Sequence, residues 1–296
     1  MSDRQNESLN AVLRCEMTAV NQQFIHVLAL RDWGHNETAE RIMAVDRVDY
    51  PNAMRIIDHL VQTGAPVVLA SERPTPGASH GGILAAERAL ERRFLAVIDS
   101  AVCTGDRARA LIAAARAPRE GYAAWLAEQL DGPGADEAAP AEAPFPETGG
   151  VLAHLIVMIE QALVHAFVHW HRGDAGVADA AWATSGAAMM QATELVRLFA
   201  ARQAMPRPGE MPALEIAGEP AVALDLDRRL AGRCATEAAA AAEACDNAEV
   251  AGLCGTIADH ASRLSRWTPG RAHPAANHDH TVFRSFETAL RRHVWR

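Results

Sequence analysis

The chain has 296 residues, of which 49% are apolar and only 5% aromatic, and 28 basic against 37 acidic side chains give a formal net charge of −9. A net acidic chain without a clustered basic face is not expected to bind nucleic acid or anionic membranes. Its length leaves room for two ordinary domains. Its alanine-rich, aromatic-poor composition is typical of helical proteins.

The cysteines and the N-terminal residues both bear on the cellular compartment. The five cysteines are an odd number, and no two of them have CxxC spacing. This pattern fits reduced thiols better than a disulfide framework or a zinc site. The first ten residues, MSDRQNESLN, lack the apolar core of a signal peptide. We therefore expect a cytoplasmic protein.

The first part of the chain contains four segments with helical periodicity. Apolar residues recur at helical spacing over residues 9–29, 37–63, 82–102 and 106–130. Glycine- and proline-containing breakers separate these segments, and the longest connection joins the second to the third. This order predicts a four-helix bundle over residues 1–130.

Residues 131–149 predict a linker, because they are rich in Pro, Gly, Ala and acidic residues and offer nothing to bury. The helical pattern then resumes over 150–268. The run from Val151 to Trp170 is about as long as the roughly 20 residues that span a bilayer. It carries several polar side chains, so we expect a buried bundle helix and no membrane span.

The two halves of the chain can be overlaid with one constant offset through their first two helices. This offset pairs Gln22 with Gln161, His26 with His165 and Gly34 with Gly173, without a gap between them. A fixed offset maintained over two helices indicates an internal duplication.

The tail, residues 269–296, contains a predicted amphipathic helix. Its apolar face consists of Val282, Phe283, Phe286, Leu290 and Val294. Two interpretations stay open: the helix caps its own bundle, or residues 281–296 dock a partner protein.

The first four helical segments resemble bacterioferritin, the haem-containing branch of the ferritin-like bundles. The resemblance lies in LNAVLRCEMTAVNQQFIHVLALRDWG, in APVVL closing the second helix, in ILAAERALERRF and in REGYAAWLAEQLD. It covers the first bundle and, through the repeat offset, reaches the second more weakly. It implies an all-α fold of two tandem ferritin-like four-helix bundles plus a C-terminal amphipathic helix. It also implies assembly with itself or with a related ferritin-like subunit.

The resemblance also identifies positions where this chain departs from a di-iron centre. Such a centre takes one Glu from each of two helices and a Glu-x-x-His from each of the other two. Glu16 and Glu91 match the two single glutamates. The second-helix motif becomes Asp49-x-x-Asn52, so a shorter acid and a neutral amide replace Glu and His.

The fourth-helix motif becomes Arg119-x-x-Tyr122, so both ligand histidines are absent. Two interpretations of the remaining residues stay open. In one, the permanent cation of Arg119 occupies a metal position and pairs with Glu16, Asp49 or Glu91 in a metal-free core. In the other, those three carboxylates hold a single residual iron.

A haem ligand is also implied by the resemblance. In the family, a methionine directly after the second-helix glutamate ligates haem on the axis between two subunits. Tyr50 follows Asp49, and Met189 follows Ala188 in the second copy. The resemblance therefore implies haem b held by Met189 and Tyr50, or by Met189 of two chains. Alternatively, Met189 and Met190 fill an apolar interface.

In the second copy, Leu155 and Ala188 stand at ligand positions, which predicts an apolar bundle centre. His165 and His169 lie one helical turn apart, a spacing that can bind zinc or copper. No acidic residue or cysteine adjacent in sequence completes a ligand set. We therefore expect surface or interface histidines.

Three functions stay open at this point. The first is a bacterioferritin-related protein with a degenerate ferroxidase centre, acting as a haem-binding or structural component of a larger assembly. The second is an iron-storage ferroxidase built on Glu16, Asp49 and Glu91. The third is a cofactor-free subunit that docks a partner through its C-terminal helix. The absent histidines weigh against enzymatic activity.

Overall fold

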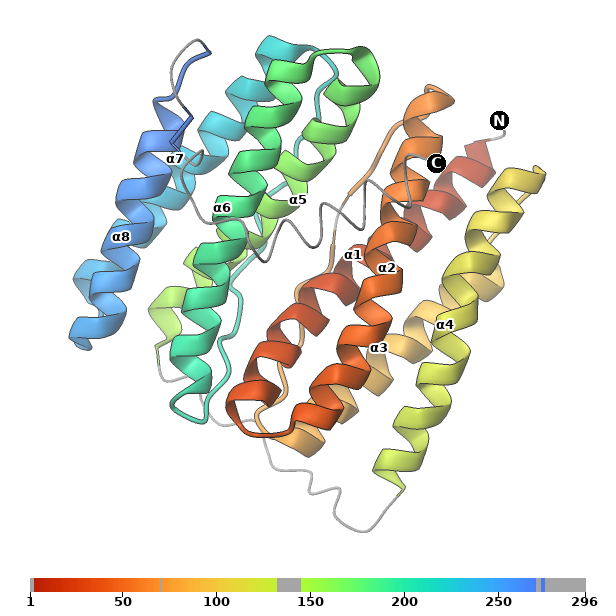
Figure 1. The fold of residues 1–296 in the computed structure, drawn as a ribbon, viewed down its shortest axis with the longest axis horizontal. Helices are drawn as coiled ribbons and strands as arrows, with labels where there is room; N and C mark the ends of the chain where they lie inside the picture. The colour runs from red at the N-terminus through yellow and green to blue at the C-terminus, as the bar shows by residue number, and fades with distance from the viewer. Residues whose placement is uncertain (1–2, 70, 132–144, 270–272, 275–296) are drawn as a thin grey trace. The chain divides into compact units, whose positions relative to one another are not determined.

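The computed structural model describes residues 3–69, 71–131, 145–269 and 273–274 (Figure 1). Within these ranges the chain forms eight α-helices and one short 3-10 helix, and no strand. The all-α prediction is confirmed. The chain divides into two compact units, Met1–Pro144 with Phe199–Met205 and Phe145–Leu198 with Pro206–Arg296. The boundary after Pro144 falls inside the segment predicted as a linker.

The first unit contains α1 (Asp3–Asp32), α2 (Asn36–Gln62), α3 (His80–Ser100) and α4 (Asp106–Leu130). Local sequence fixes where these helices begin and end. Gly34 adopts a left-handed φ of 85° between α1 and α2, a conformation that glycine reaches without steric cost. The Ser79 hydroxyl accepts a hydrogen bond from the Gly82 N–H and so caps α3.

Two prolines lie inside helices of the first unit, Pro51 in α2 and Pro118 in α4. A proline has no N–H, so the carbonyl four residues earlier loses its helical partner. For Pro118 that carbonyl belongs to Ala114, and the Asn52 side-chain amide donates to it at 3.1 Å. The proline in α4 thus creates the acceptor that ties α2 to α4.

The second unit contains α5 (Gly149–Arg172), α6 (Ala175–Ala200), α7 (Pro220–Ala244) and α8 (Ala248–Ser265), preceded by the 3-10 helix η1 (Pro146–Thr148). The last residues of the predicted linker are therefore helical. By length and composition, Pro146–Arg172 passes for a membrane-spanning helix within the described residues. However, 94% of its most apolar window is buried.

Three helices of each unit begin at matching places. The first residues of α2 and α6, Asn36 and Ala175, have the same spacing as the Gln22 and Gln161 pair, and Gly173 has a φ of 82°, close to that of Gly34. The starts of α3 and α7 pair His80 with Pro220, and those of α4 and α8 pair Asp106 with Ala248. Counting from these starts pairs residues of α2, α3 and α4 with residues of α6, α7 and α8, and the spacing of the Gln22 and Gln161 pair does the same for α1 and α5.

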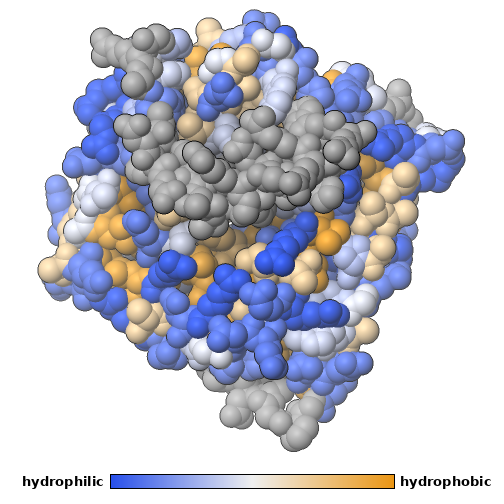
Figure 2. Space-filling model, viewed as in Figure 1, coloured by the Kyte–Doolittle hydropathy of each residue, from blue (hydrophilic) through white to orange (hydrophobic). Residues whose placement is uncertain are grey.

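Hydrophilic side chains cover most of the face seen in Figure 2, with apolar patches between them. The exposed large apolar residues of the described chain are Val48, Val68, Val102, Trp170 and Val222. The predicted amphipathic helix of the tail lies outside the described residues.

A buried carboxylate and arginine cluster as the candidate functional site

The four helices of the first unit each contribute one residue to a buried ionic cluster. Arg119 of α4 lies against Glu16 of α1, Asp49 of α2 and Glu91 of α3. Its Nη1 donates to Glu91 Oε1, and its Nη2 lies against Asp49 Oδ2 and 3.3 Å from Glu16 Oε2. All four side chains are essentially inaccessible, with exposures of 0 to 1%. Arg119 therefore contacts all three of the carboxylates that the sequence names as its candidate partners.

An aromatic ring completes the surroundings of the guanidinium. Arg119 Cζ lies 4.2 Å from the centroid of the Phe94 ring. The electron-rich face of an aromatic ring attracts a cation at this distance, more strongly when water is excluded. Phe94 is fully buried on α3, one turn after Glu91. The guanidinium therefore contacts three carboxylates and the face of an aromatic ring.

Burial changes the proton affinity of the cluster's carboxyl groups. Burial and the nearby Asp49 charge raise the pKa of Glu16 well above its ordinary value. Burial raises the pKa of Asp49 to about 7 and that of Glu91 to about 8, although the Arg119 charge lowers both. Asp46, on the same helix as Asp49, reaches a pKa of about 7 for the same reason. Raised pKa values mean that these four carboxyl groups bind protons more readily near neutral pH than exposed acids do.

Arg119 itself stays charged. Burial lowers its pKa, but the charges of Asp49, Glu91 and Glu16 outweigh burial and raise the pKa above its ordinary value. An uncompensated buried charge would cost several kcal/mol, and the carboxylates supply the compensation. The cluster is thus a set of acids and bound protons arranged around one fixed cation.

The residues at the cluster do not fit a di-iron centre. The guanidinium occupies the space between the three carboxylates, and its positive charge repels a metal cation. Asn52, at a ligand-histidine position, uses its amide for Ala114 and accepts from Arg55 at 3.0 Å. Within the described residues, no three or more His, Cys, Asp or Glu side chains form a group that could hold a metal ion.

A second buried network contains an acid that the motif comparison missed. Glu87 of α3 accepts from the Tyr122 hydroxyl at 2.9 Å and from Gln22 at 3.2 Å, and lies 2.6 Å from His26 Nδ1. Burial raises the pKa of Glu87, but the hydrogen bonds from His26, Gln22 and Tyr122 outweigh it and lower the pKa. Glu87 lies one helical turn before Glu91 on the same face, and this spacing was the available sequence signal.

The other ends of the Gln22 and His26 side chains hold the long loop between α2 and α3. The Thr75 N–H donates to Gln22 Oε1 at 3.0 Å, and the Gly77 N–H donates to His26 Nε2 at 3.4 Å. An imidazole that accepts at Nε2 carries its hydrogen on Nδ1, so this arrangement has His26 donate to Glu87. We call this set of Gln, His, acid and loop amides the loop clamp.

The second unit contains the same loop clamp at equivalent positions. Asp227 accepts from Gln161 at 2.9 Å and lies 2.8 Å from His165 Nδ1. The Glu215 N–H donates to Gln161 Oε1, and the Ala217 N–H donates to His165 Nε2, both at 3.1 Å. Gln161 and His165, which the sequence offset aligns with Gln22 and His26, thus have the same structural role in their own unit.

The ionic cluster has no counterpart in the second unit. The residues equivalent to Glu16, Asp49, Glu91 and Arg119 are, in that order, Leu155, Ala188, Ala231 and Ala261. All four are buried, with exposures of 0 to 1%. The second unit therefore has an apolar centre where the first has an ionic one.

The expectation for His165 and His169 was wrong. Both are fully buried, and each contacts a carboxylate that is distant in sequence or beyond the helix end. His165 pairs with Asp227, and His169 Nδ1 lies 3.2 Å from Asp174 Oδ2. They are histidines of the core, each bound to its own acid. The sequence around α5 could not show the partner of His165, because Asp227 lies on α7, far along the chain, whereas Asp174 just after α5 was within reach of sequence reasoning.

The two residues implied as haem ligands lie in different units and differ in their surroundings. Tyr50 is buried, and burial raises the pKa of its phenol well above the ordinary value. Because a metal-bound ligand must be deprotonated, burial makes Tyr50 a poor haem ligand. Met189 is partly exposed on α6, next to the fully buried Ala188.

Comparison with known proteins gives no assignment: no family model, curated protein or solved structure matches this chain.

Proposed function

We propose that this chain is a tandem duplication of a bacterioferritin-related four-helix bundle, serving as a structural component without ferroxidase activity. The observation that carries the proposal is the Arg119 guanidinium between Glu16, Asp49 and Glu91. One carboxylate comes from each of three helices and the cation from the fourth, which is the distribution expected of a former metal cage.

The charge balance supports a role in stability. In a di-iron centre the carboxylates neutralise two divalent cations. Here the negative charge of the carboxylates is balanced by one guanidinium and by bound protons. The arginine is covalently part of α4, so the charge compensation is permanent and independent of metal supply. The bundle consequently keeps its packing without iron.

Aerobic oxidation of Fe(II) tests this proposal. The purified protein should oxidise added Fe(II) no faster than buffer, and its thermal midpoint should not change with Fe(II), Mn(II) or Zn(II). The matched variant Glu91→Ala should show the same oxidation rate as the parent protein. Oxidation well above the buffer rate in the parent and lost in Glu91→Ala would establish a ferroxidase and refute the proposal.

Haem binding at Met189 is a second candidate, favoured by the partial exposure of this side chain beside small buried residues. Met189 of two chains would restore the symmetric ligation that the resemblance implies, without a role for Tyr50. Haem-supplemented protein should then show a Soret band at one haem per two chains, and Met189→Ala should lose it while Met190→Ala keeps it. No Soret band, or one that survives in Met189→Ala, would exclude this candidate.

A further inference from the structure

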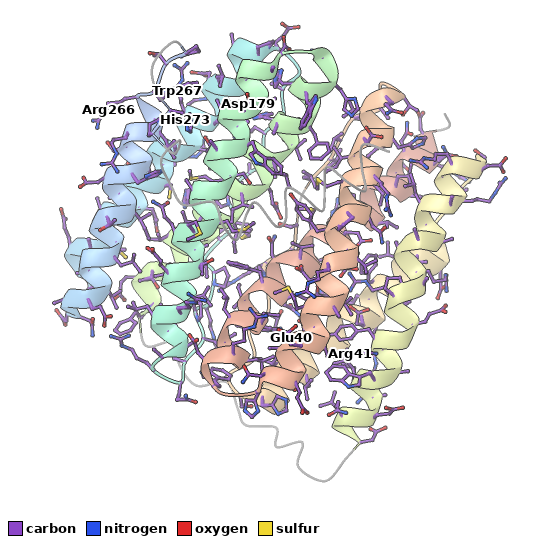
Figure 3. All side chains as sticks on the ribbon, viewed as in Figure 1. Glu40, Arg41, Asp179, Arg266, Trp267 and His273 are labelled. Carbon is purple, nitrogen blue, oxygen red and sulfur yellow. The ribbon has the colours of Figure 1, made fainter. Side chains whose placement is uncertain are left out.

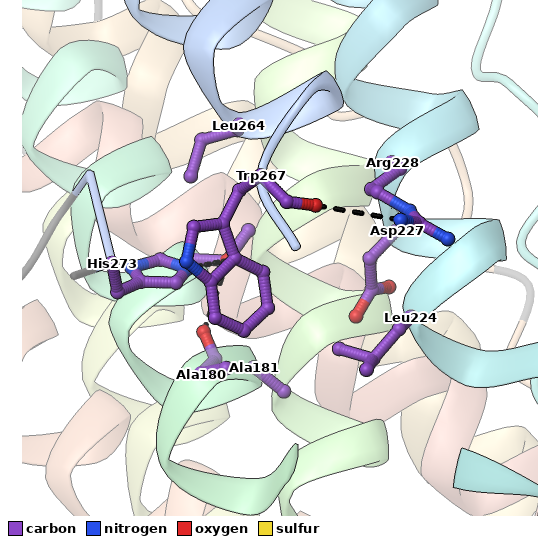
Figure 4. Close-up of a pocket in the computed structure, with 9 residues that line it drawn as sticks. Ala180, Ala181, Leu224, Asp227, Arg228, Leu264, Trp267 and His273 are labelled. Atoms are coloured by element: carbon purple, nitrogen blue, oxygen red, sulfur yellow. Dashed lines mark hydrogen bonds between the residues drawn. The ribbon is translucent and has the colours of Figure 1, made fainter. Parts of the chain in front are cut away.

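The second unit contains a small pocket between α6, α7 and α8 (Figure 4). It encloses a cavity of about 20 Å³, which is room for one water molecule, and it opens to solvent. The enclosed part therefore admits one small group, such as a single NH2, and the rest of a ligand would lie in the open mouth of the pocket. The residues that line it include Ala180, Thr184, Asp227, Leu264, Trp267 and His273.

At the equivalent place in the first unit, an exposed arginine and a buried tyrosine contact the tryptophan and the acid. Arg41 of α2 extends its guanidinium over Trp125 of α4, with Cζ 5.9 Å from the ring centroid. The Tyr122 hydroxyl donates to Glu87 Oε2 at 2.9 Å. The first unit thus supplies a cation for the tryptophan and a hydrogen-bond donor for the acid.

The second unit keeps the acid and a tryptophan but lacks the arginine and the tyrosine. Counting along the matched helices, Asp227, Ala180 and Leu264 stand at the positions of Glu87, Arg41 and Tyr122, and the same count carried two residues past the end of α8 pairs Trp267 with Trp125. Figure 3 shows Arg41 on α2 and Trp267 beyond the end of α8. Two large polar side chains are therefore replaced by smaller apolar ones.

One oxygen of Asp227 is available to a ligand. Its Oδ1 accepts from Gln161 and His165, while Oδ2 has no hydrogen-bond or ion-pair partner among the described residues. The side chain is only 10% exposed. In Figure 4 the carboxylate points toward Leu224, away from Arg228. A carboxylate oxygen that lines the pocket and has no donor among the described residues can accept from a ligand that carries N–H groups.

The cation among the lining residues, Arg228, is directed at other groups than Asp227. It donates to the Trp267 carbonyl at 3.4 Å and lies 3.7 Å from Asp225, which also pairs with Arg229. His273 lies edge-on to Trp267 at 4.8 Å and 3.3 Å from Thr184 Oγ1. Burial lowers the pKa of His273 to about 4, so its ring is neutral.

We propose that this pocket binds a small planar organic cation of the guanidinium or amidinium class, between the Asp227 carboxylate and the Trp267 ring. The N–H groups would donate to Asp227 Oδ2, as the Tyr122 hydroxyl donates to Glu87, and the planar cation would lie on the indole as Arg41 does on Trp125. The inference depends on the equivalence of the two units and is independent of any iron or haem chemistry.

The test is a titration of the full chain with methylguanidinium, followed by the indole N–H resonances of the six tryptophans. Trp267→Phe assigns the resonance of interest. We expect a saturable shift of the Trp267 signal with a dissociation constant on the order of 1 mM, a modest affinity suited to a ligand of few atoms. Methylurea has a similar planar shape without charge, and it should give no saturable shift.

Three variants decide the outcome. Asp227→Asn keeps an acceptor for His165 and Gln161 and should weaken binding at least tenfold. The pair Ala180→Arg with Leu264→Tyr restores the first unit's residues and should abolish binding. Arg41→Ala should open the equivalent place, so that methylguanidinium also shifts the Trp125 signal. The proposal is overturned if the Trp267 signal does not shift, if methylurea shifts it equally, or if Asp227→Asn binds as tightly as the parent.

Discussion

Arg119 places one positive charge among the buried carboxyl groups of Glu16, Asp46, Asp49 and Glu91. The role of this charge can be separated from the packing contribution of the side chain. The methylene chain and the ring contact with Phe94 contribute packing, whereas the guanidinium compensates the charges of Glu16, Asp49 and Glu91. Replacing Arg119 by methionine keeps most of the volume and removes the charge. The carboxyl groups then remain buried with nothing to pair with except protons.

We predict that Arg119→Met lowers the free energy of unfolding by about 3–5 kcal/mol at pH 8, because it leaves buried charges uncompensated. The loss should be smaller at pH 5.5, where Asp49 and Glu91, with pKa values of about 7 and 8, are protonated and neutral. Urea unfolding at the two pH values measures both effects. The control is Arg116→Met, a partly exposed arginine on the same helix. Equal losses at both pH values would contradict the role assigned to the charge.

Helix α4 shows how an unfavourable residue acquires a structural use. Pro118 removes an N–H from the middle of the helix, and the freed Ala114 carbonyl becomes the acceptor for Asn52 of α2. This hydrogen bond lies next to the ionic cluster, since Arg119 directly follows Pro118. The contact therefore helps to fix how α4 presents its arginine to the other helices.

The Asn52 contact makes a prediction at the level of the helix pair. Asn52→Ala should cost about 1 kcal/mol, because a half-buried carbonyl loses its donor. The cost should shrink when Pro118→Ala is already present, since an alanine N–H at that position can satisfy the Ala114 carbonyl. A double-mutant cycle of denaturant unfolding measures the coupling. If the changes in unfolding free energy of the two variants are additive, the Ala114 carbonyl does not couple Asn52 to Pro118.

The loop clamp gives a second prediction for an element. His26→Ala should remove the acceptor of the Gly77 N–H and speed its hydrogen exchange, leaving the equivalent Ala217 amide unchanged. His165→Ala should do the reverse. Exchange monitored by NMR or by peptide mass spectrometry distinguishes the two loops. Protection that persists at Gly77 in His26→Ala would show that the loop is held by other contacts.

The helices were predictable from sequence, whereas several side-chain partners were not. Periodicity located the four helices of the first unit and the return of helical structure after the linker. The resemblance grouped Glu16, Asp49, Glu91 and Arg119, because motif positions carry spatial information. Asp227 escaped prediction, since its partners lie on another helix that is distant along the chain. The pocket was not predicted, because it depends on small side chains at positions where the first unit has large ones. Finding those positions requires α7 and α8 to be aligned with α3 and α4, which the helix starts in the structure allow.

At the scale of the whole chain, the two units differ in how they respond to protons. In the first unit Asp46, Asp49 and Glu91 have pKa values raised from their ordinary range to about 7, 7 and 8. Ser185, Ala188 and Ala231 stand at the equivalent positions of the second unit. A group whose pKa is raised by folding stabilises the fold at low pH and loses that contribution as pH rises through the raised value.

We therefore predict that the first unit loses stability between pH 5.5 and pH 8.5, by on the order of 1–3 kcal/mol, while the second changes less. Glu87, whose pKa is lowered, stays ionised over this window and does not offset the trend. Pulsed hydrogen exchange across a urea series, read in peptides of α2 and α4 against α6 and α8, follows each unit separately. Asp46→Asn should flatten the pH dependence of the first unit. Equal slopes in both units would refute the prediction.

The loop clamp is present in both units, and this bears on which residues are older than the proposed duplication. Under the proposed duplication, what the copies share was inherited from one ancestor, and what they do not share arose or was lost afterwards. The Gln, His and acid that hold each loop are therefore ancestral, whereas at least one of the two bundle centres is a later change. Under that proposal, both copies kept the residues that fix the path of the chain, whereas the residues at the bundle centre changed.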